Sequence, residues 1–381
     1  MPDLVALDLD GGPAFVDALV RVWERGDAAC VLDRRLPAPA AAELVAVLAP
    51  SSILDADGER RLAGGRGVEP GDALVVATSG SLGRRRAAVL THQAVAASAR
   101  ATSEAVHADP ATTRWLCCLP LAHIGGLSVV TRALLTATPL EVLAAFDASV
   151  VESLGRRGRA THVSLVATAL ARLDPAVFAC IVLGGAAPPR DLPDNVVTTY
   201  GMTETGSGVV YDGVPLEVVE VGFGAGADGG AEGEILLRCP MQLRAYRDGT
   251  DPTVPGPDGT GGWLPTGDGG HLDDGRLVVD GRLAEIVVTG AEKVWPGEVE
   301  AVLAGHPKVA EVAVWKRPDP EWGERVVAWV VPADDADPPS LGELAGLAGE
   351  RLAPWAGPKE LVLVASLPRT ASGKVRRTAL S

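Results

Sequence analysis

Cysteine and positive charge are both scarce in this sequence. Only 5 of its 381 residues are cysteines, and the one close pair, Cys117 and Cys118, is adjacent instead of spaced as metal ligands are. We therefore expect buried, reduced thiols and neither a disulfide framework nor a zinc site. Lys and Arg number 34 against 49 Asp and Glu, a net charge of −15. Because phosphate backbones require clustered cations, nucleic acid is not expected as a partner.

The sequence also lacks a long hydrophobic run. Its longest uncharged stretch, residues 115–131, falls just short of a bilayer span and contains a proline and two glycines, so we expect buried core there and no membrane span. Asp3, Asp8 and Asp10 occupy the first ten residues, where a secretory signal would place basic and then apolar residues. These features predict a cytoplasmic protein.

Length and patterning predict a globular protein with an α/β core. A chain of 381 residues exceeds the roughly 250–300 residues at which one core usually stops growing, so two domains are expected. Apolar runs alternate with loops and helical patterns, which favours parallel strands. From about residue 215, short strands with Gly and Asp turns predict a β-rich subdomain, and residues 285–381 predict a small α+β module. The core strands are expected at residues 73–77, 115–119, 162–166, 180–183 and 196–199.

A short loop after the strand at residues 73–77 has the composition of an anion site. It reads Thr-Ser-Gly-Ser-Leu-Gly over residues 78–83, and three arginines follow at residues 84–86. Small residues let backbone N–H groups and hydroxyls approach an oxyanion, and the arginines add charge. The spacing is not that of a Walker A loop. Alone, the pattern leaves open both a phosphate site and a surface turn with solvated arginines.

Further polar motifs follow in order along the chain. Thr203 and Glu204 come just after an apolar strand pattern, where a hydroxyl can bind phosphate and a carboxylate can hold Mg²⁺. Asp268 offers an acceptor for a vicinal diol, Arg282 precedes a Gly-containing hairpin, and Lys374 lies on a Ser-Gly turn. The alternatives are a plain turn residue for Asp268, a structural arginine for Arg282 and a solvated terminal lysine for Lys374.

In this order the motifs resemble those of the acyl-adenylate-forming superfamily, which includes acyl-CoA synthetases, peptide-synthetase adenylation domains and firefly luciferase. The resemblance runs from residue 74 to residue 380. It implies a large N-terminal domain of α/β sheets plus a β-rich subdomain over residues 1–281, a hinge at residues 282–285, and a small mobile α+β domain over residues 286–381. It also implies an enzyme that uses ATP and Mg²⁺ to convert an acid to acyl-AMP and pyrophosphate, then transfers the acyl group to CoA.

The resemblance further implies roles for single residues. Thr203 would contact the α-phosphate of ATP, and Glu204 would coordinate Mg²⁺. Asp268 would bind the ribose hydroxyls, assisted by Arg282, and Lys374 would reach the α-phosphate and the substrate carboxylate. The other implied contacts are Thr78, Ser79, Gly80, Ser81, Gly83 and Arg86 for the β- and γ-phosphates; Gly184, Gly185, Ala186, Tyr200 and Gly201 for the adenine; His123, Gly125, Ser164 and Thr168 for the acyl pocket; and Gly290 and Ala291 for the CoA channel.

Several positions depart from the family pattern. In the phosphate loop, Leu82 replaces a threonine and Arg86 a lysine, which removes a hydroxyl and changes the geometry of the cation. Ala284 stands where the hinge residue is commonly Asp or Lys. These changes predict weakened pyrophosphate handling and altered hinge energetics. The phosphate loop also begins earlier in the chain than is typical, which predicts an abbreviated N-terminal subdomain.

Two stretches indicate the acid. Residues 119–135 and 161–173 resemble the corresponding stretches of the o-succinylbenzoate:CoA ligases of menaquinone biosynthesis, where His-Ile-x-Gly-Leu-Ser and Thr-His-x-Ser-Leu-Val recur. The resemblance implies 2-succinylbenzoate, activated through its aliphatic carboxylate. The second carboxylate needs a polar or cationic partner, for which His123, Ser164 and Thr168 are candidates.

Alternatives to this assignment stay open. Ala167 stands where a proline is usual, and Gly125 where a serine is common. A CoA ligase for another small aryl or short-chain acid is the nearest alternative. A catalytically weak nucleotide-binding relative and an enzyme that loads a carrier-protein pantetheine are two more, and an isolated His123 would be a satisfied core histidine. A homodimer is the default expectation for the assembly.

Overall fold

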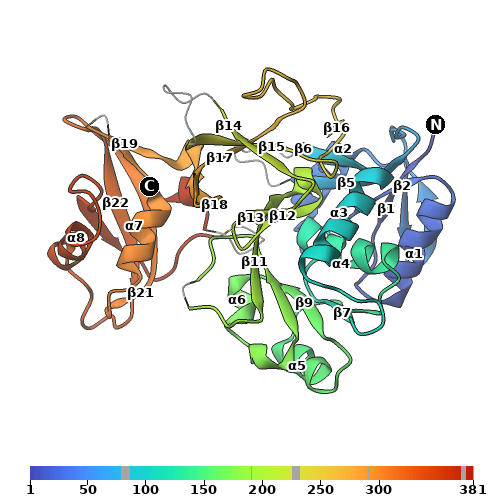
Figure 1. Cartoon of the computed structure of the whole chain (residues 1–381), viewed down its shortest axis with the longest axis horizontal. Helices are drawn as coiled ribbons and strands as arrows, with labels where there is room; N and C mark the ends of the chain where they lie inside the picture. Colours follow the sequence, from blue (N-terminus) through green and yellow to red (C-terminus); the bar gives the residue numbers. More distant parts are fainter. Residues whose placement is uncertain (79–85, 190, 225–231, 291, 370–374, 381) are drawn as a thin grey trace. The chain divides into compact units, whose positions relative to one another are not determined.

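The computed structural model describes residues 1–78, 86–189, 191–224, 232–290, 292–369 and 375–380 (Figure 1). Contacts divide the chain into two compact units. The first comprises residues 1–222, 236–265 and 274–277, and the second comprises residues 223–235, 266–273 and 278–381. The domain boundary at residues 282–285 stays a prediction.

A seven-stranded sheet opens the first unit. Its central strands β5, β2, β1 and β3 run parallel, and β6 returns antiparallel to β5. The interior strands β1 and β2 are buried at every position because helices cover the sheet. In spatial order the strands are β16 (Ala245–Tyr246), β6 (Arg86–Thr91), β5 (Asp72–Thr78), β2 (Ala28–Val31), β1 (Leu4–Leu7), β3 (Ser52–Asp55) and β4 (Gly58–Arg61).

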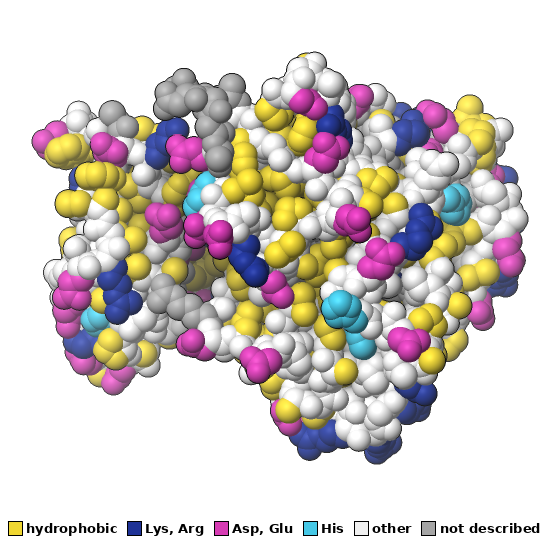
Figure 2. All heavy atoms as spheres, viewed as in Figure 1, with side chains coloured by type: hydrophobic (Ala, Val, Ile, Leu, Met, Phe, Trp, Pro, Cys, Tyr) yellow, Lys and Arg dark blue, Asp and Glu magenta, His cyan; other side chains and the backbone are white. Residues whose placement is uncertain are grey.

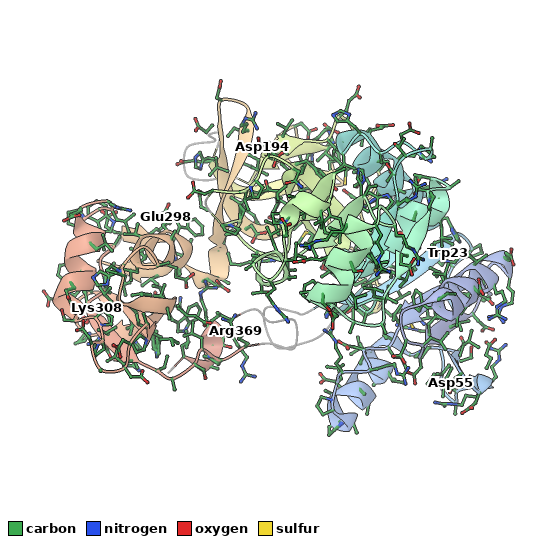
Figure 3. The ribbon with its side chains drawn as sticks, turned by 90° about the horizontal axis from the view of Figure 1, so that it is seen from below. Trp23, Asp55, Asp194, Glu298, Lys308 and Arg369 are labelled. Atoms are coloured by element: carbon green, nitrogen blue, oxygen red, sulfur yellow. The ribbon has the colours of Figure 1, made fainter. Side chains whose placement is uncertain are left out.

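Three helices pack on this sheet: α1 (Pro13–Glu24), α2 (Ala38–Leu48) and α3 (His92–Ala105). Helix α1 is tied to the strand that leads into the phosphate loop. Trp23, labelled in Figure 3, donates from Nε1 to the carbonyl of Ala73 at 2.9 Å and meets the ring of His92 edge-on. Both sides of the predicted phosphate loop are therefore anchored in the core.

A second seven-stranded sheet carries the remaining motifs of the first unit. Strands β8, β7, β9, β10 and β11 are parallel, and β12 and β13 are antiparallel additions. Helices α4 (Ile124–Leu135), α5 (Ala148–Arg156) and α6 (Ala167–Leu170) connect the parallel strands. In spatial order the strands are β13 (Val214–Pro215), β12 (Ser207–Tyr211), β11 (Val196–Met202), β10 (Cys180–Leu183), β9 (His162–Leu165), β7 (Trp115–Cys117) and β8 (Leu140–Val142).

The division between the units passes through a four-stranded sheet of β14 (Glu220–Phe223), β15 (Glu232–Arg238), β17 (Leu264–Asp273) and β18 (Arg276–Arg282). The second unit has its own five-stranded sheet, in which β22 pairs with β21, β19 and β23. Its strands are β19 (Val287–Thr289), β20 (Glu292–Val294), β21 (Val309–Asp319), β22 (Gly323–Pro332) and β23 (Glu360–Leu363), and its helices are α7 (Pro296–Leu303) and α8 (Leu341–Gly349). These elements confirm the predicted α/β class, its β-rich part and its small α+β part.

The burial of the cysteines and the mixture of charges on the surface agree with the composition. The five cysteines are free and buried, and burial raises the pKa of the Cys30 thiol to about 12 and of the Cys180 thiol to about 11. Acidic and basic side chains are interspersed on the face in Figure 2, and basic ones gather near α5, where Arg156 and Arg159 pair with Glu152 and Glu141. Within the described ranges, no helix is long and apolar enough to cross a membrane.

Candidate active site

The phosphate loop joins the two strands of a β-hairpin. Thr78 and Arg86 face each other at the open end of β5 and β6, and the Thr78 hydroxyl donates to the Arg86 carbonyl at 3.5 Å. The strand β6 therefore follows the loop directly, and α3 begins only at His92, where Thr91 caps it. The loop residues Ser79, Gly80, Ser81, Leu82 and Gly83 lie outside the described residues.

Glu204 lies at the carboxyl end of β11, in a single 3₁₀ turn over Thr203–Thr205. The Thr205 hydroxyl accepts from the Met202 amide at 3.0 Å, and Gly206 ends the turn in the left-handed region at φ 68°. Glu204 is buried, at 8% exposure, and its carbonyl accepts from the Leu243 amide at 2.6 Å. The turn thus holds a carboxylate at the edge of the sheet where ligands of α/β folds bind.

Tyr246 meets this carboxylate and was missed by the sequence analysis. Its hydroxyl donates to Oε1 of Glu204 at 2.9 Å, a bond to a charged acceptor worth about 1.5–3 kcal/mol. Burial, together with the Glu204 charge, raises the pKa of Tyr246 to about 12, so its hydroxyl is a donor across the working pH range. The tyrosine reaches the site because β16 pairs with β6, a contact between segments far apart in the chain. The only signal for this residue in the sequence itself is that tyrosine is rare, with 3 in the chain.

The predicted adenine segment follows β10 and β11. Gly184 has no room for a side chain, because a Cβ atom would lie 2.9 Å from Cγ2 of Thr199, and Gly185 has a φ of 89°. At Gly201 a Cβ atom would lie 2.2 Å from the Ser207 carbonyl, beside the bulge between Tyr200 and Gly201. These glycines leave backbone exposed at the carboxyl edge of the sheet, as a flat base would require; Ala186 is exposed on the same segment.

The predicted acyl-pocket residues come from α4, β9 and α6. His123 precedes the first residue of α4, and its Nε2 lies 3.0 Å from Nη2 of Arg35, which in turn pairs with Asp33 at 2.7 Å. Ser164 is buried on β9, and Thr168 is exposed on α6.

The close glycine contact in this region is at Gly126 and not at Gly125. A Cβ atom at Gly126 would lie 2.5 Å from the Pro120 carbonyl, whereas one at Gly125 would meet only a Leu119 methyl at 3.7 Å. The backbone therefore requires glycine at Gly126, and Gly125 leaves space for a ligand or a larger side chain.

Arg132, which the sequence analysis also missed, is a buried cation on α4. It is 2% exposed, and burial lowers the pKa of its guanidinium. Its Nη2 donates to the Ser207 hydroxyl at 3.4 Å, and the guanidinium lies 4.6 Å from the centre of the Trp115 ring. In the part of the chain that the structure describes, its Nε and Nη1 atoms have no hydrogen-bond partner. A buried guanidinium with two unpartnered nitrogens is costly to desolvate.

Asp268 and Arg282 form a pair within the second unit. Asp268 is buried on β17, at 7% exposure, and its Oδ1 lies 2.9 Å from Nε of Arg282 on β18. Arg282 also donates to the Thr266 carbonyl at 3.0 Å. Gly267, between Thr266 and Asp268 in the chain, has a φ of 72°. The carboxylate is held in one orientation and can accept from ribose hydroxyls, with the guanidinium beside it.

The predicted CoA-channel loop and the C-terminal lysine are only partly described. Gly290 lies in the left-handed region at φ 61°, and a Cβ atom there would lie 2.6 Å from the Trp322 ring. Ala291 and Lys374 lie outside the described residues. Arg377, three residues after Lys374, bonds Glu285 at 2.7 Å and Glu300 at 2.7 Å. The end of the lysine segment is therefore tied to Glu285, next to the departure at Ala284.

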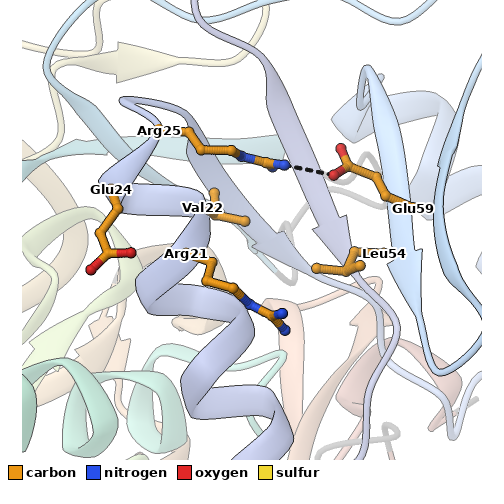
Figure 4. Close-up of a pocket in the computed structure, with 6 residues that line it drawn as sticks. All are labelled: Arg21, Val22, Glu24, Arg25, Leu54 and Glu59. Atoms are coloured by element: carbon orange, nitrogen blue, oxygen red, sulfur yellow. Dashed lines mark hydrogen bonds and ion pairs between the residues drawn. The ribbon is translucent and has the colours of Figure 1, made fainter.

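Figure 4 shows a pocket near the amino terminus of the chain. It is a shallow hollow lined by residues of α1 and of β3 and β4, with an ion pair between Arg25 and Glu59 at 2.7 Å. It contains none of the predicted site residues.

A magnesium ion fits the first unit's residues. Mg²⁺ is usually held by one or two carboxylates together with substrate phosphates, and Glu204 supplies a carboxylate of that kind. The described residues contain no group of three or more His, Cys, Asp or Glu that could hold a metal alone. With Glu204 as the protein ligand, the other ligands of the ion would be nucleotide phosphate oxygens and water.

Comparison with known proteins agrees with these features. The model of the AMP-binding enzyme family matches residues 64–246, and that of the AMP-binding enzyme C-terminal domain matches residues 298–374. The probable 2-succinylbenzoate–CoA ligase of Mycobacterium tuberculosis is 38% identical over 341 residues, which cover 83% of this chain and 85% of that protein.

Solved structures extend the similarity to the fold. The o-succinylbenzoate CoA synthetase of Bacillus subtilis, in complex with its acyl-adenylate intermediate, gives a TM-score of 0.84 at 28% identity over 100% of this chain and 88% of that chain. In complex with ATP and magnesium ion the same enzyme gives 0.85 at 27% identity, over 99% and 89%. The chain therefore belongs to the AMP-binding enzyme family and is an adenylate-forming ligase.

Proposed function

We propose that this chain activates 2-succinylbenzoate with ATP and transfers the acyl group to CoA, as in menaquinone biosynthesis. The similar ligases in M. tuberculosis and B. subtilis support this substrate. The observation that carries the proposal is Arg132, a buried cation with unpartnered donors. An acid with one carboxylate would leave this charge without a counter-ion, whereas the ring carboxylate of 2-succinylbenzoate supplies one.

In the proposed reaction the aliphatic carboxylate of the acid attacks the α-phosphorus of ATP and pyrophosphate departs. Thr203 contacts the α-phosphate, while the β5–β6 hairpin and Arg86 hold the β- and γ-phosphates. Glu204 holds Mg²⁺, which supplies positive charge against the phosphate oxygens when it is bound with ATP. Asp268 orients the ribose, and Lys374 places an ammonium between the two reacting anions.

The second step is transfer to CoA. The thiol of CoA attacks the carbonyl carbon of the acyl-adenylate, its proton is lost, and AMP leaves with the electrons of the C–O bond. Gly290 and Ala291 form part of the proposed CoA channel, and the left-handed backbone and the close Trp322 ring at Gly290 favour glycine there. We expect a cytoplasmic homodimer; the free, buried thiols fit a reducing compartment.

Replacing Arg132 by leucine is expected to raise KM for 2-succinylbenzoate by about 10- to 100-fold, because the ring carboxylate loses its charged partner. KM for 4-oxo-4-phenylbutanoate, which lacks that carboxylate, is expected to change less than about twofold, because it makes no such pair. Steady-state acyl-CoA formation with the two acids measures this difference.

The analogue serves as the control for damage to the pocket. The thermal midpoint of the ligand-free variant should not fall, because the substitution removes a buried charge that no described carboxylate neutralises. An equal rise of KM for both acids would contradict the role of Arg132. Wild-type protein that prefers a simple aryl or short-chain acid would overturn the substrate.

A further inference from the structure

Three side chains from three separate elements form one chain of contacts beside the phosphate hairpin. The hydroxyl of Tyr246 on β16 donates to Oε1 of Glu204 at 2.9 Å. The ring of the same tyrosine lies 4.6 Å from the guanidinium carbon of Arg86, the first residue of β6. One tyrosine therefore touches the carboxylate proposed for Mg²⁺ and the arginine at the end of the phosphate loop.

The position of Tyr246 is fixed from both sides. Its strand pairs with β6, with Tyr246 opposite Ala88, and the amide of Arg247 donates to the Ala87 carbonyl at 2.7 Å. The buried guanidinium of Arg247 donates to the carbonyls of Leu48 at 2.9 Å and Gly67 at 2.7 Å. A short strand of two residues is thus locked into the core, and the tyrosine between its anchors has little freedom.

We infer that Tyr246 is a positioning residue for adenylation: its hydroxyl orients the Glu204 carboxylate for Mg²⁺, and its ring holds Arg86 at the phosphate hairpin. The inference rests on the proposed function, since it concerns the same site. A glutamate has several rotamers, and a hydrogen bond to one oxygen selects the rotamer that leaves the metal-binding oxygen in place.

The same contact explains the arginine at residue 86. A planar guanidinium stacks on an aromatic face, whereas the compact, strongly hydrated ammonium of lysine does so less well. Where the family has a lysine, this chain thus has Arg86, whose guanidinium packs on the Tyr246 ring. Arg86→Lys is therefore not a conservative change in this chain.

The test is the coupling between Mg²⁺ and ATP in the Tyr246→Phe variant, which keeps the ring and removes the hydroxyl. Isothermal titration calorimetry gives Kd for ATP with Mg²⁺ and with EDTA. The factor by which Mg²⁺ tightens ATP binding is expected to fall about 10- to 100-fold, the loss of one hydrogen bond to a charged group. Kd in EDTA is expected to change less than this factor, since the ring still supports Arg86.

Tyr211→Phe is the matched control, because Tyr211 also donates a buried hydrogen bond, to Thr102 at 3.0 Å. It should leave the coupling factor unchanged. In a Glu204→Gln background, Tyr246→Phe should add little further loss, since both act through one carboxylate. Tyr246→Leu and Arg86→Lys should weaken ATP binding in EDTA as well.

Two outcomes overturn the inference: an unchanged coupling factor in Tyr246→Phe, or a full further loss in the Glu204→Gln background. Failure of the proposed function is seen separately, as a wild-type protein that binds ATP but releases no pyrophosphate with 2-succinylbenzoate. The calorimetric coupling between Mg²⁺ and ATP is measured without the acid. It therefore tests the role of Tyr246 whether or not the proposed substrate is correct.

Discussion

Lys374→Ala is expected to slow acyl-adenylate formation by about 10²- to 10³-fold, because the variant loses the ammonium that we propose lies between the attacking carboxylate and the α-phosphate. Thioester formation from supplied acyl-adenylate is expected to change little, since that step brings no second anion to the phosphate. Acid-dependent pyrophosphate release measures the first step, and CoA consumption with synthetic acyl-adenylate measures the second.

The C-terminal segment supplies a matched control for this variant. Arg376 is exposed and lies two residues after Lys374, so Arg376→Ala removes a nearby positive charge. Arg377 should be left intact, because it ties the segment to Glu285 and Glu300. A similar loss in both half-reactions for Lys374→Ala would contradict its role, as would a similar loss in Arg376→Ala.

Glu204→Gln is expected to lower the rate of adenylation by about 10²-fold and to raise the Mg²⁺ concentration needed for half-maximal rate, because a neutral amide is a poor magnesium ligand. The amide oxygen still accepts from Tyr246, so the surrounding structure should persist. The measurement is pyrophosphate release at saturating ATP over a series of Mg²⁺ concentrations.

Glu217, an exposed glutamate of the same unit, provides the control for loss of one negative charge. Glu217→Gln should leave the Mg²⁺ dependence as it is. A wild-type Mg²⁺ dependence in Glu204→Gln would show that another group holds the ion.

The local pattern of apolar residues was sufficient to predict the core strands of the fold. The strand expected at residues 180–183 is β10, Cys180–Leu183, because a continuous apolar run between turns is typical of a buried parallel strand. The motif residues at Gly184 and Thr203 follow strand ends because ligand sites of such sheets lie at carboxyl edges. The residues after the phosphate loop form a strand, Arg86–Thr91, and then a helix from His92.

Long-range contacts account for what the sequence did not reveal. Tyr246 belongs to the site only because β16 pairs with β6. A strand of two residues is too short to show an alternating pattern in the sequence. Arg132 lies in an apolar helix pattern, where nothing distinguishes a buried arginine with unpartnered nitrogens from a paired one. Gly125 and Gly126 are likewise equivalent in sequence, and only the nearby Pro120 carbonyl shows which one must be glycine.

The proposed reaction joins 2-succinylbenzoate to CoA through an acyl-adenylate. Its most direct test is mass spectrometry of the products formed by the purified protein with ATP, Mg²⁺, CoA and 2-succinylbenzoate. We expect 2-succinylbenzoyl-CoA and AMP in equal amounts, neither of them without the acid, and acyl-AMP when CoA is omitted. Formation of acyl-CoA from simple acids but not from 2-succinylbenzoate, or of neither product from any acid, would contradict it.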